Sequence, residues 1–253
     1  KWMISLKTDN QLNAEAIQLR ETWGLNPNGS IDITSVVLSK LPNLTLLYIP
    51  FSENTSGMCI NDGNIKIIGI NSTMTKGRQR FTLAHELYHL LIEENTGKPI
   101  ICNNPLRDDS EREADKFASY LLMSEEGLSQ YCDMNNIDEW NLSNIISVEQ
   151  YFQISHHALL IRLLNNRLIS KKEFDEYKGK YISYEARIRG YGDELYRPSP
   201  KEDQYMTLGK YINTIEYLDE TNKISQSKKK ELLLDGYRGD LVFNVDKGDD
   251  IND

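Results

Sequence analysis

The chain has 253 residues, of which 39% are hydrophobic and 26% charged, and its formal net charge is −9. A chain of this length can bury a substantial core, as one elaborated domain or two small ones. The acidic balance argues against nucleic-acid binding, because that requires clustered Lys and Arg, and favours a protein or peptide partner. The sequence has no membrane-spanning apolar run and no secretory signal pattern, so we expect a cytoplasmic protein.

The first part of the chain predicts two helices followed by three strands. Apolar residues recur at helical spacing in two short stretches, and three β-rich runs follow them. The predicted helices cover residues 12–23 and 35–41, and the predicted strands cover residues 44–49, 56–60 and 65–70. Asp62-Gly63 lies between the last two strands and predicts a hairpin, since glycine supplies the positive φ of a tight turn.

Helical periodicity returns in the next part of the chain. One helix is predicted from residue 78 to 91, and a second over 110–123, after a polar connection over 94–109. The order of two helices, three strands and two helices predicts an α+β fold, with a small sheet over helices.

The stretch RFTLAHELYHLL, from Arg80 to Leu91, places two histidines four residues apart with a glutamate beside the first. On a helix, His85 and His89 lie one turn apart on the same face and can bind one Zn²⁺ ion. Glu86 lies beside them and can reach a metal-bound water without ligating the ion. This H-E-x-x-H pattern is typical of zinc peptidases, in which the glutamate takes the proton of the attacking water.

A catalytic zinc site needs a third protein ligand, and the helix over 110–123 offers Glu111 or Glu113. Glu111 shares a row with alanines, which would let the two helices approach closely. Glu113 fits a capping box with Ser110, but a capping explanation exists for Glu111 as well, so capping does not decide between them. Asp115, one turn beyond Glu111, is a candidate to accept the remaining N–H of a liganding histidine.

These motifs together resemble the ImmA/IrrE family of metallopeptidases. The resemblance is carried by RFTLAHELYHLL, by IIGINS before it and by E-x-x-A-D-x-F-A-x-x-L-L-M after it. It is strong over residues 56–123 and extends more loosely to 168. Two positions depart from the family pattern: Tyr88 stands where glycine is frequent, and Ser124 where proline is frequent. Neither departure removes a ligand, although Tyr88 would either crowd the cleft or supply a phenol near it.

The resemblance implies a zincin-like metallopeptidase domain. In such a domain His85, His89 and Glu111 would hold the zinc, and Glu86 would be the catalytic acid/base. Members of this family are known for cleaving helix-turn-helix transcriptional repressors at specific sites, so the implied partner is a protein substrate of that kind.

Zincin-like folds border the cleft with a strand that pairs with an extended substrate, and here residues 56–60 or 65–70 would be that edge. Cys59, on the predicted hairpin, would lie near the metal or be a buried, inert thiol. The sequence leaves open which donor stabilises the oxyanion. Four side chains are candidates for it: Tyr88, Tyr120, His156 and His157.

The rest of the chain predicts mainly helices. Residues 145–189 contain a helix-turn-helix-like pattern with a turn at Ile154-Ser155, for which packing on the peptidase domain is preferred over reading DNA. A break follows at 197–200, and then a helical pair over 205–218 and 225–237 and an acidic tail. We therefore predict three segments. They are a zincin-like domain over 1–143, a helical segment packed on it over 144–190, and a helical C-terminal extension over 191–253.

The sequence thus predicts a cytoplasmic zinc metalloendopeptidase that acts on a specific protein. Two other hypotheses remain: a toxin-like or regulatory partner of a repressor, with a latent or structural metal site, and a DNA-binding regulator that uses residues 145–189. The sequence does not fix the substrate, the cleavage site, the activating trigger or the oligomeric state.

Overall fold

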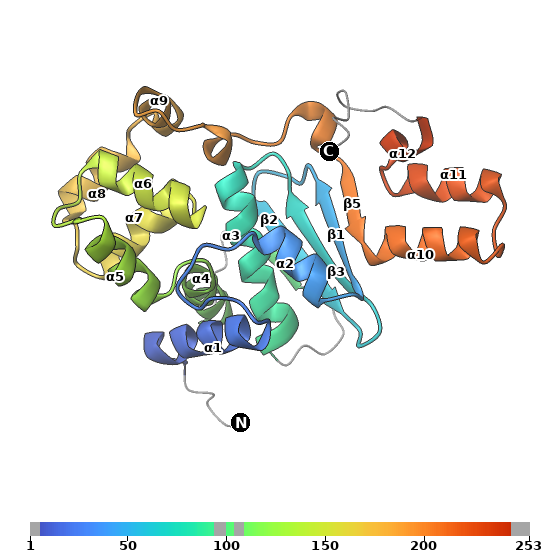
Figure 1. Ribbon diagram of the computed structural model, residues 1–253, viewed down its shortest axis with the longest axis horizontal. Helices are drawn as coiled ribbons and strands as arrows, with labels where there is room; N and C mark the ends of the chain where they lie inside the picture. Colours follow the sequence, from blue (N-terminus) through green and yellow to red (C-terminus); the bar gives the residue numbers. More distant parts are fainter. Residues whose placement is uncertain (1–5, 94–99, 104–108, 244–253) are drawn as a thin grey trace.

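The computed structural model describes residues 6–93, 100–103 and 109–243. They form the α+β fold that the sequence predicts, in which helices lie against and beside one five-stranded sheet (Figure 1). The strands are β1 (Leu44–Ile49), β2 (Thr55–Asn61), β3 (Lys66–Asn71), β4 (Ile100–Asn103) and β5 (Met206–Gly209). The α-helices are α1 (Asp9–Thr22), α2 (Ile33–Lys40), α3 (Lys76–Leu87), α4 (Asp109–Leu122), α5 (Glu125–Met134), α6 (Leu142–Phe152), α7 (His156–Asn165), α8 (Lys171–Lys178), α9 (Ile182–Ile188), α10 (Lys210–Glu220), α11 (Gln226–Asp235) and α12 (Gly239–Phe243).

The sheet has the strand order β4-β2-β3-β1-β5. β1 and β3 are parallel, and the predicted hairpin of β2 and β3 is confirmed as an antiparallel pair. Its turn is built as the sequence predicts. Gly63 has a φ of +92°, and the Asp62 carboxylate accepts hydrogen bonds from the backbone N–H groups of Asn64 and Ile65.

Two strands were not predicted. β4 lies in the stretch 94–109 that the sequence predicts as a polar connection, and it pairs with β2. β5 begins the stretch 205–218 that the sequence predicts as helix, and it pairs with β1 before α10 starts. Both strands have four residues, too few to show a clear alternation, and only their partners in the sheet make them strands.

α3 lies across β2 and β3, and α4 packs against both α3 and α1. The core between them is made of fully buried apolar side chains, including Leu12, Leu46, Ile68, Ile70, Leu83, Leu87, Phe117 and Leu121. Arg20 of α1 is also fully buried, and its guanidinium donates to five backbone carbonyls. Two of these carbonyls belong to Leu121 and Leu122, so Arg20 fixes α1 to the end of α4.

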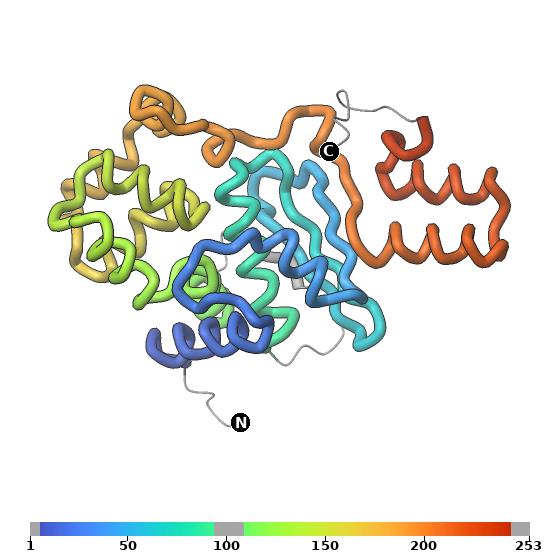
Figure 2. Tube along the Cα trace, viewed as in Figure 1, coloured from blue at the N-terminus to red at the C-terminus, as the bar shows by residue number. Residues whose placement is uncertain are grey.

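Helices α5 to α9 gather on one side of the molecule, and α10 to α12 lie beyond the opposite edge of the sheet (Figure 1). A segment without regular strands or long helices, residues 193–200, connects the two sides and passes the start of α3 (Figure 2). There Lys76 donates its backbone N–H to Arg197 O at 2.8 Å, and Ser199 donates its own to Ser72 O at 3.2 Å. The predicted break at 197–200 is therefore a non-helical segment held by hydrogen bonds.

The same connecting segment is fixed to the helical side through a buried carboxylate. Glu149 of α6 is fully buried, and it accepts hydrogen bonds from Tyr196 Oη at 2.7 Å and from His156 Nδ1 at 2.6 Å. The division into segments 1–143, 144–190 and 191–253 stays a prediction. The predicted acidic tail, the last eight residues, lies outside the described residues. Within the described part of the chain, no helix is long and apolar enough to cross a membrane.

Candidate metal centre

The H-E-x-x-H motif lies on α3 and on the turn that continues it. Thr75 caps α3 by accepting the Arg78 N–H, and the helix runs straight into a π-helical turn over Tyr88–Ile92. The sequence predicts an ordinary α-helix there, whereas π-helical turns inside α-helices are frequent at functional sites. His85 and His89 still face each other, with their Nε2 atoms 3.3 Å apart.

α4 brings Glu111 to the same point. One Glu111 oxygen lies 3.4 Å from His85 Nε2 and the other lies 3.4 Å from His89 Nε2. Zinc bonds of about 2.0–2.1 Å in a tetrahedron place neighbouring ligand atoms about 3.3–3.4 Å apart, which matches the distance between the two Nε2 atoms. The two contacts to Glu111 are made by different oxygens, and one ligand atom from each of the three residues lies within 4.8 Å of the others. His85, His89 and Glu111 therefore fit a divalent metal ion such as Zn²⁺, with a fourth position left for water.

Each imidazole is held from behind by a carboxylate. His85 donates from Nδ1 to Asp115 at 3.0 Å, the contact that the sequence predicts. His89 donates from Nδ1 to Glu93 at 2.6 Å, and the other Glu93 oxygen accepts from Ser110 Oγ at 2.8 Å. Such bonds fix the ring orientation and leave Nε2 as the ligand atom. Sequence reasoning missed Glu93, although its position four residues after His89 was a usable signal.

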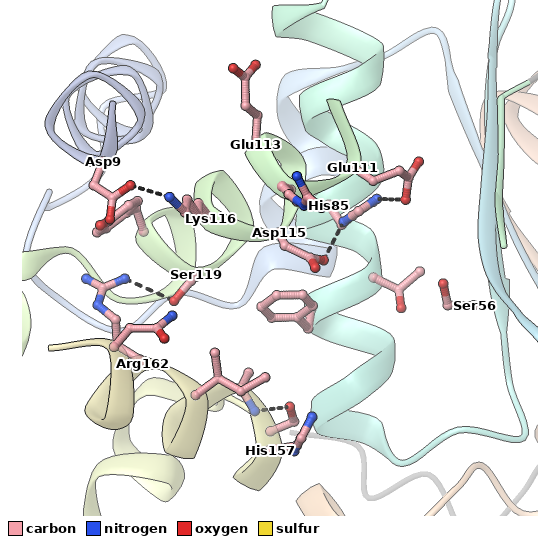
Figure 3. A pocket seen from close by; sticks show the side chains of 18 of the residues that line it. Asp9, Ser56, His85, Glu111, Glu113, Asp115, Lys116, Ser119, His157 and Arg162 are labelled. Atoms are coloured by element: carbon pink, nitrogen blue, oxygen red, sulfur yellow. Dashed lines mark hydrogen bonds and ion pairs between the residues drawn. The ribbon is translucent and has the colours of Figure 1, made fainter. Parts of the chain in front are cut away.

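Glu113, the alternative third ligand, is engaged elsewhere. Its carboxylate accepts the Tyr88 hydroxyl and the Lys7 backbone N–H, each at 2.6 Å, and in Figure 3 it points away from His85. Tyr88 itself is buried, and its ring packs on Phe117 at 5.5 Å between centroids. The Tyr88 hydroxyl therefore points to Glu113, while its ring packs edge-to-face against His89 at 5.8 Å between centroids.

The carboxylates change the acid–base behaviour of the cluster. Burial alone would lower the pKa of His85, but hydrogen bonds to Asp115 and Glu111 outweigh burial and raise the pKa to about 10. Burial would raise the pKa of Glu111, but hydrogen bonds from His85 and His89 hold it far below its usual range. The cluster thus combines an ionised carboxylate with imidazoles that bind protons tightly, so protons and a metal ion compete for the same nitrogens.

Glu86 points from α3 toward the sheet. Its side chain is fully buried against β2, where Gly57 and Cys59 lie. It belongs to the same helical turn as His85 but is not one of the three side chains that converge on the candidate metal position. Its role as proton acceptor stays a prediction.

A cleft of about 370 Å³ opens beside His85 and Glu111 (Figure 3). α3 contributes Phe81 and Thr82 to its wall, and α7 contributes Ala158 and Ile161. The helix-turn-helix-like segment therefore supplies one wall of the cleft at the candidate metal centre.

Of the four candidates for the oxyanion donor, two are occupied. The Tyr88 hydroxyl is bonded to Glu113, and His156 lies between Glu149 and the Tyr177 carbonyl. Tyr120 and His157 line the cleft, so these two stay candidates.

The predicted substrate-binding edge was wrong. Residues 56–60 and 65–70 belong to β2 and β3, and each of these strands already has a neighbour on both sides. β4 pairs with β2 and is the outer strand on this side of the sheet, so β2 has no free edge to offer a peptide.

The fold and the cluster place an H-E-x-x-H helix against a small sheet, with a group of side chains that could hold a metal ion. Residues 41–164 match the family model Peptidase_M78, described as the IrrE N-terminal-like domain. Over these residues the chain is similar to members of the ImmA/IrrE family. A search of curated proteins gave no match. Among solved structures, a Mycobacterium tuberculosis transcriptional regulator is similar, with 13% identity and a TM-score of 0.41; the match covers 61% of this chain and 46% of that one, so this chain spans less than half of that protein's length.

Proposed function

We propose that this protein is a zinc-dependent endopeptidase that hydrolyses a peptide bond in a specific protein, a helix-turn-helix transcriptional repressor, in the cytoplasm. The observation that carries the proposal is the convergence of His85, His89 and Glu111 at separations of 3.3 to 3.4 Å between their polar atoms, with Glu86 beside them on α3. The match of residues 41–164 to a peptidase family model supports the same interpretation.

In this proposal His85, His89 and Glu111 hold the ion, and Asp115 and Glu93 keep the two imidazoles in register. A zinc ion bound there would polarise the substrate carbonyl and lower the pKa of its bound water. Glu86 takes the proton of the attacking water and passes it to the leaving amine.

Two observations support a repressor as substrate, beyond the family. The cleft beside His85 is wide enough for side chains of an extended or partly unfolded segment to enter. The chain carries a net charge of −9, whereas DNA-binding repressors carry basic surfaces. Opposite charges steer the two proteins together and favour the correct partner over acidic ones.

The test compares Glu86→Gln with the wild-type protein, each incubated with a helix-turn-helix repressor encoded beside it. We expect Glu86→Gln to bind one zinc ion as the wild type does, and to lose cleavage, because only the proton acceptor changes. Glu113→Gln makes the same chemical change outside the cluster and should cleave normally. Fragments are identified by mass spectrometry, and zinc by elemental analysis.

A wild-type protein that binds zinc and the repressor but cleaves nothing would favour the regulatory-partner hypothesis. Salt-dependent binding to bare duplex DNA would instead favour the DNA-binding hypothesis.

A further inference from the structure

β2 presents two residues to the buried face of Glu86. Gly57 and Cys59 are two positions apart on the strand, so their side-chain directions are the same and both face α3. Cys59 is fully buried, and β2 is held between β3 and β4. Neither residue has a role in holding the candidate metal ion.

Gly57 lies where a side chain has no room. A Cβ atom at this position would lie 2.7 Å from Glu86 Oε1 and 3.0 Å from the backbone oxygen of Gly69 on β3, and 2.5 Å from the Thr82 methyl group. Thr82 and Glu86 are one turn apart on α3, so two successive turns of the helix contact the bare backbone of β2. β2 is hydrogen-bonded to β3 on one side and to β4 on the other, so it resists moving away from α3.

Cys59 lies on the same side of β2 as Gly57, so its fully buried thiol faces the same carboxylate. Burial, followed by the negative charge of Glu86, raises the pKa of this thiol far above its usual range, so the thiol stays neutral and can donate. An S–H group is a weak donor, so it orients a carboxylate without strongly competing for its lone pairs.

We propose that Gly57 and Cys59 are positioning residues for Glu86. Gly57 leaves the space that the Glu86 carboxylate occupies, and Cys59 donates its S–H to that carboxylate. This inference rests on the proposed function, in which Glu86 transfers protons. β2 cannot pair with a substrate because it is internal to the sheet, and the proposal gives it a different role, the positioning of Glu86.

The first variant is Gly57→Ala. The added Cβ atom would lie 2.7 Å from Glu86 Oε1, so Glu86 Oε1 must move away by about 0.7 Å to restore an ordinary contact of 3.4 Å. Misplacements of this size at a reacting group cost on the order of 10²-fold in rate. We expect kcat on the repressor to fall about 10- to 100-fold, while KM and the zinc stoichiometry stay within about threefold of wild type.

Gly69→Ala is the matched control. It adds the same methyl group on the adjacent strand, where the new carbon meets the side chains of Met58 and Phe51 and not Glu86. It should leave kcat unchanged. If Gly57→Ala folds, binds zinc and keeps the wild-type kcat, the proposal is overturned.

A double variant tests the space directly. Glu86→Asp shortens the side chain by one methylene and lowers kcat by itself. In the Gly57→Ala background the shorter carboxylate avoids the added methyl group. The loss of kcat in the double variant should therefore be at least about threefold smaller than the product of the losses in the two single variants. Losses that multiply would show that Gly57 acts on something other than Glu86.

Cys59 gives tests that survive if Gly57→Ala does not fold. Cys59→Ala removes the donor and should lower kcat with KM unchanged, whereas Cys59→Ser supplies a hydroxyl and should recover part of the loss. The S–H stretching band in the Raman spectrum, assigned by its disappearance in Cys59→Ser, should shift in Glu86→Gln. A band unmoved by Glu86→Gln overturns the proposal.

The Raman result needs no turnover, so it separates this inference from the proposed function. A wild-type protein that cleaves nothing refutes the peptidase, and the S–H band still reports whether Cys59 holds Glu86.

Discussion

Asp115 and His85 form a hydrogen bond of 3.0 Å through the imidazole nitrogen that faces away from Glu111. α4 therefore touches both sides of one ring, with Glu111 at Nε2 and Asp115, one turn later, at Nδ1. The second contact fixes the tautomer and the ring plane, which is how residues behind a metal ligand strengthen metal binding.

Asp115→Asn is expected to lower zinc affinity about 10- to 100-fold, because the neutral amide supports the His85 ring less well. Competition with a chromophoric chelator measures the change. Glu113→Gln, two residues earlier on α4, should leave the affinity at the wild-type value since its carboxylate serves Tyr88. Equal affinities for Asp115→Asn and wild type would remove Asp115 from the site.

Zinc binding is expected to release protons at pH 7 to 8. The pKa of His85 is raised to about 10, since its bonds to Asp115 and Glu111 outweigh the effect of burial, so metal-free His85 is protonated at that pH. The stabilisation from protonated His85 is full below the unfolded pKa of about 6.5 and is lost as the pH rises through about 10. Because a proton must leave His85 before zinc binds, the apparent zinc affinity should rise as the pH increases from about 6.5 to about 10.

Calorimetry in buffers of different ionisation enthalpy counts the released protons. We expect about one proton or more per zinc ion. Binding that releases no proton at pH 7 to 8 would contradict the raised pKa of His85.

Ala158→Trp is expected to fill the cleft from its α7 wall. Cleavage of the repressor should fall at least about tenfold, because the added ring occupies space that a substrate side chain needs, while zinc binding is unchanged. Leu168→Trp adds a similar ring in the exposed turn after α7 and should cleave as wild type does. Unchanged kinetics in Ala158→Trp would show that the substrate avoids this part of the cleft.

Tyr196→Phe is expected to destabilise the protein by about 1–3 kcal/mol, since it takes a donor from the fully buried Glu149 carboxylate. Urea unfolding measures the loss. Tyr184→Phe, which removes a hydroxyl from an exposed side chain, should change the free energy of unfolding by less than about 0.5 kcal/mol. Equal stabilities of the two variants would mean that Tyr196 does not stabilise Glu149.

The sequence predicted the central elements because their patterns are local. β1, β2 and β3 alternate or run apolar between turn residues, and α3 and α4 repeat apolar residues at helical spacing, so each is visible without its neighbours. β4 and β5 are short and become strands only by pairing with β2 and β1, which no local pattern records.

The candidate site shows the same division. His85, Glu86 and His89 follow from spacing on one helix, and the row of alanines with Glu111 correctly pointed to the side of α4 that meets them. The choice between Glu111 and Glu113 needed the packing of Tyr88 and Lys7, which lie far apart in the chain. Gly57 could not be identified from sequence, because its importance comes from atoms of α3 and β3 that surround it.

β5, from the late part of the chain, covers the outer backbone edge of β1. β1 covers Leu44–Ile49, whereas the strand that pairs with its outer side, Met206–Gly209, comes more than 150 residues later in the chain. A fragment cut at residue 164, where the family match ends, would expose the backbone groups of β1 to neighbouring molecules and invite edge-to-edge aggregation. In the full chain the outer strand is β5, and its four residues offer a shorter edge than the six of β1.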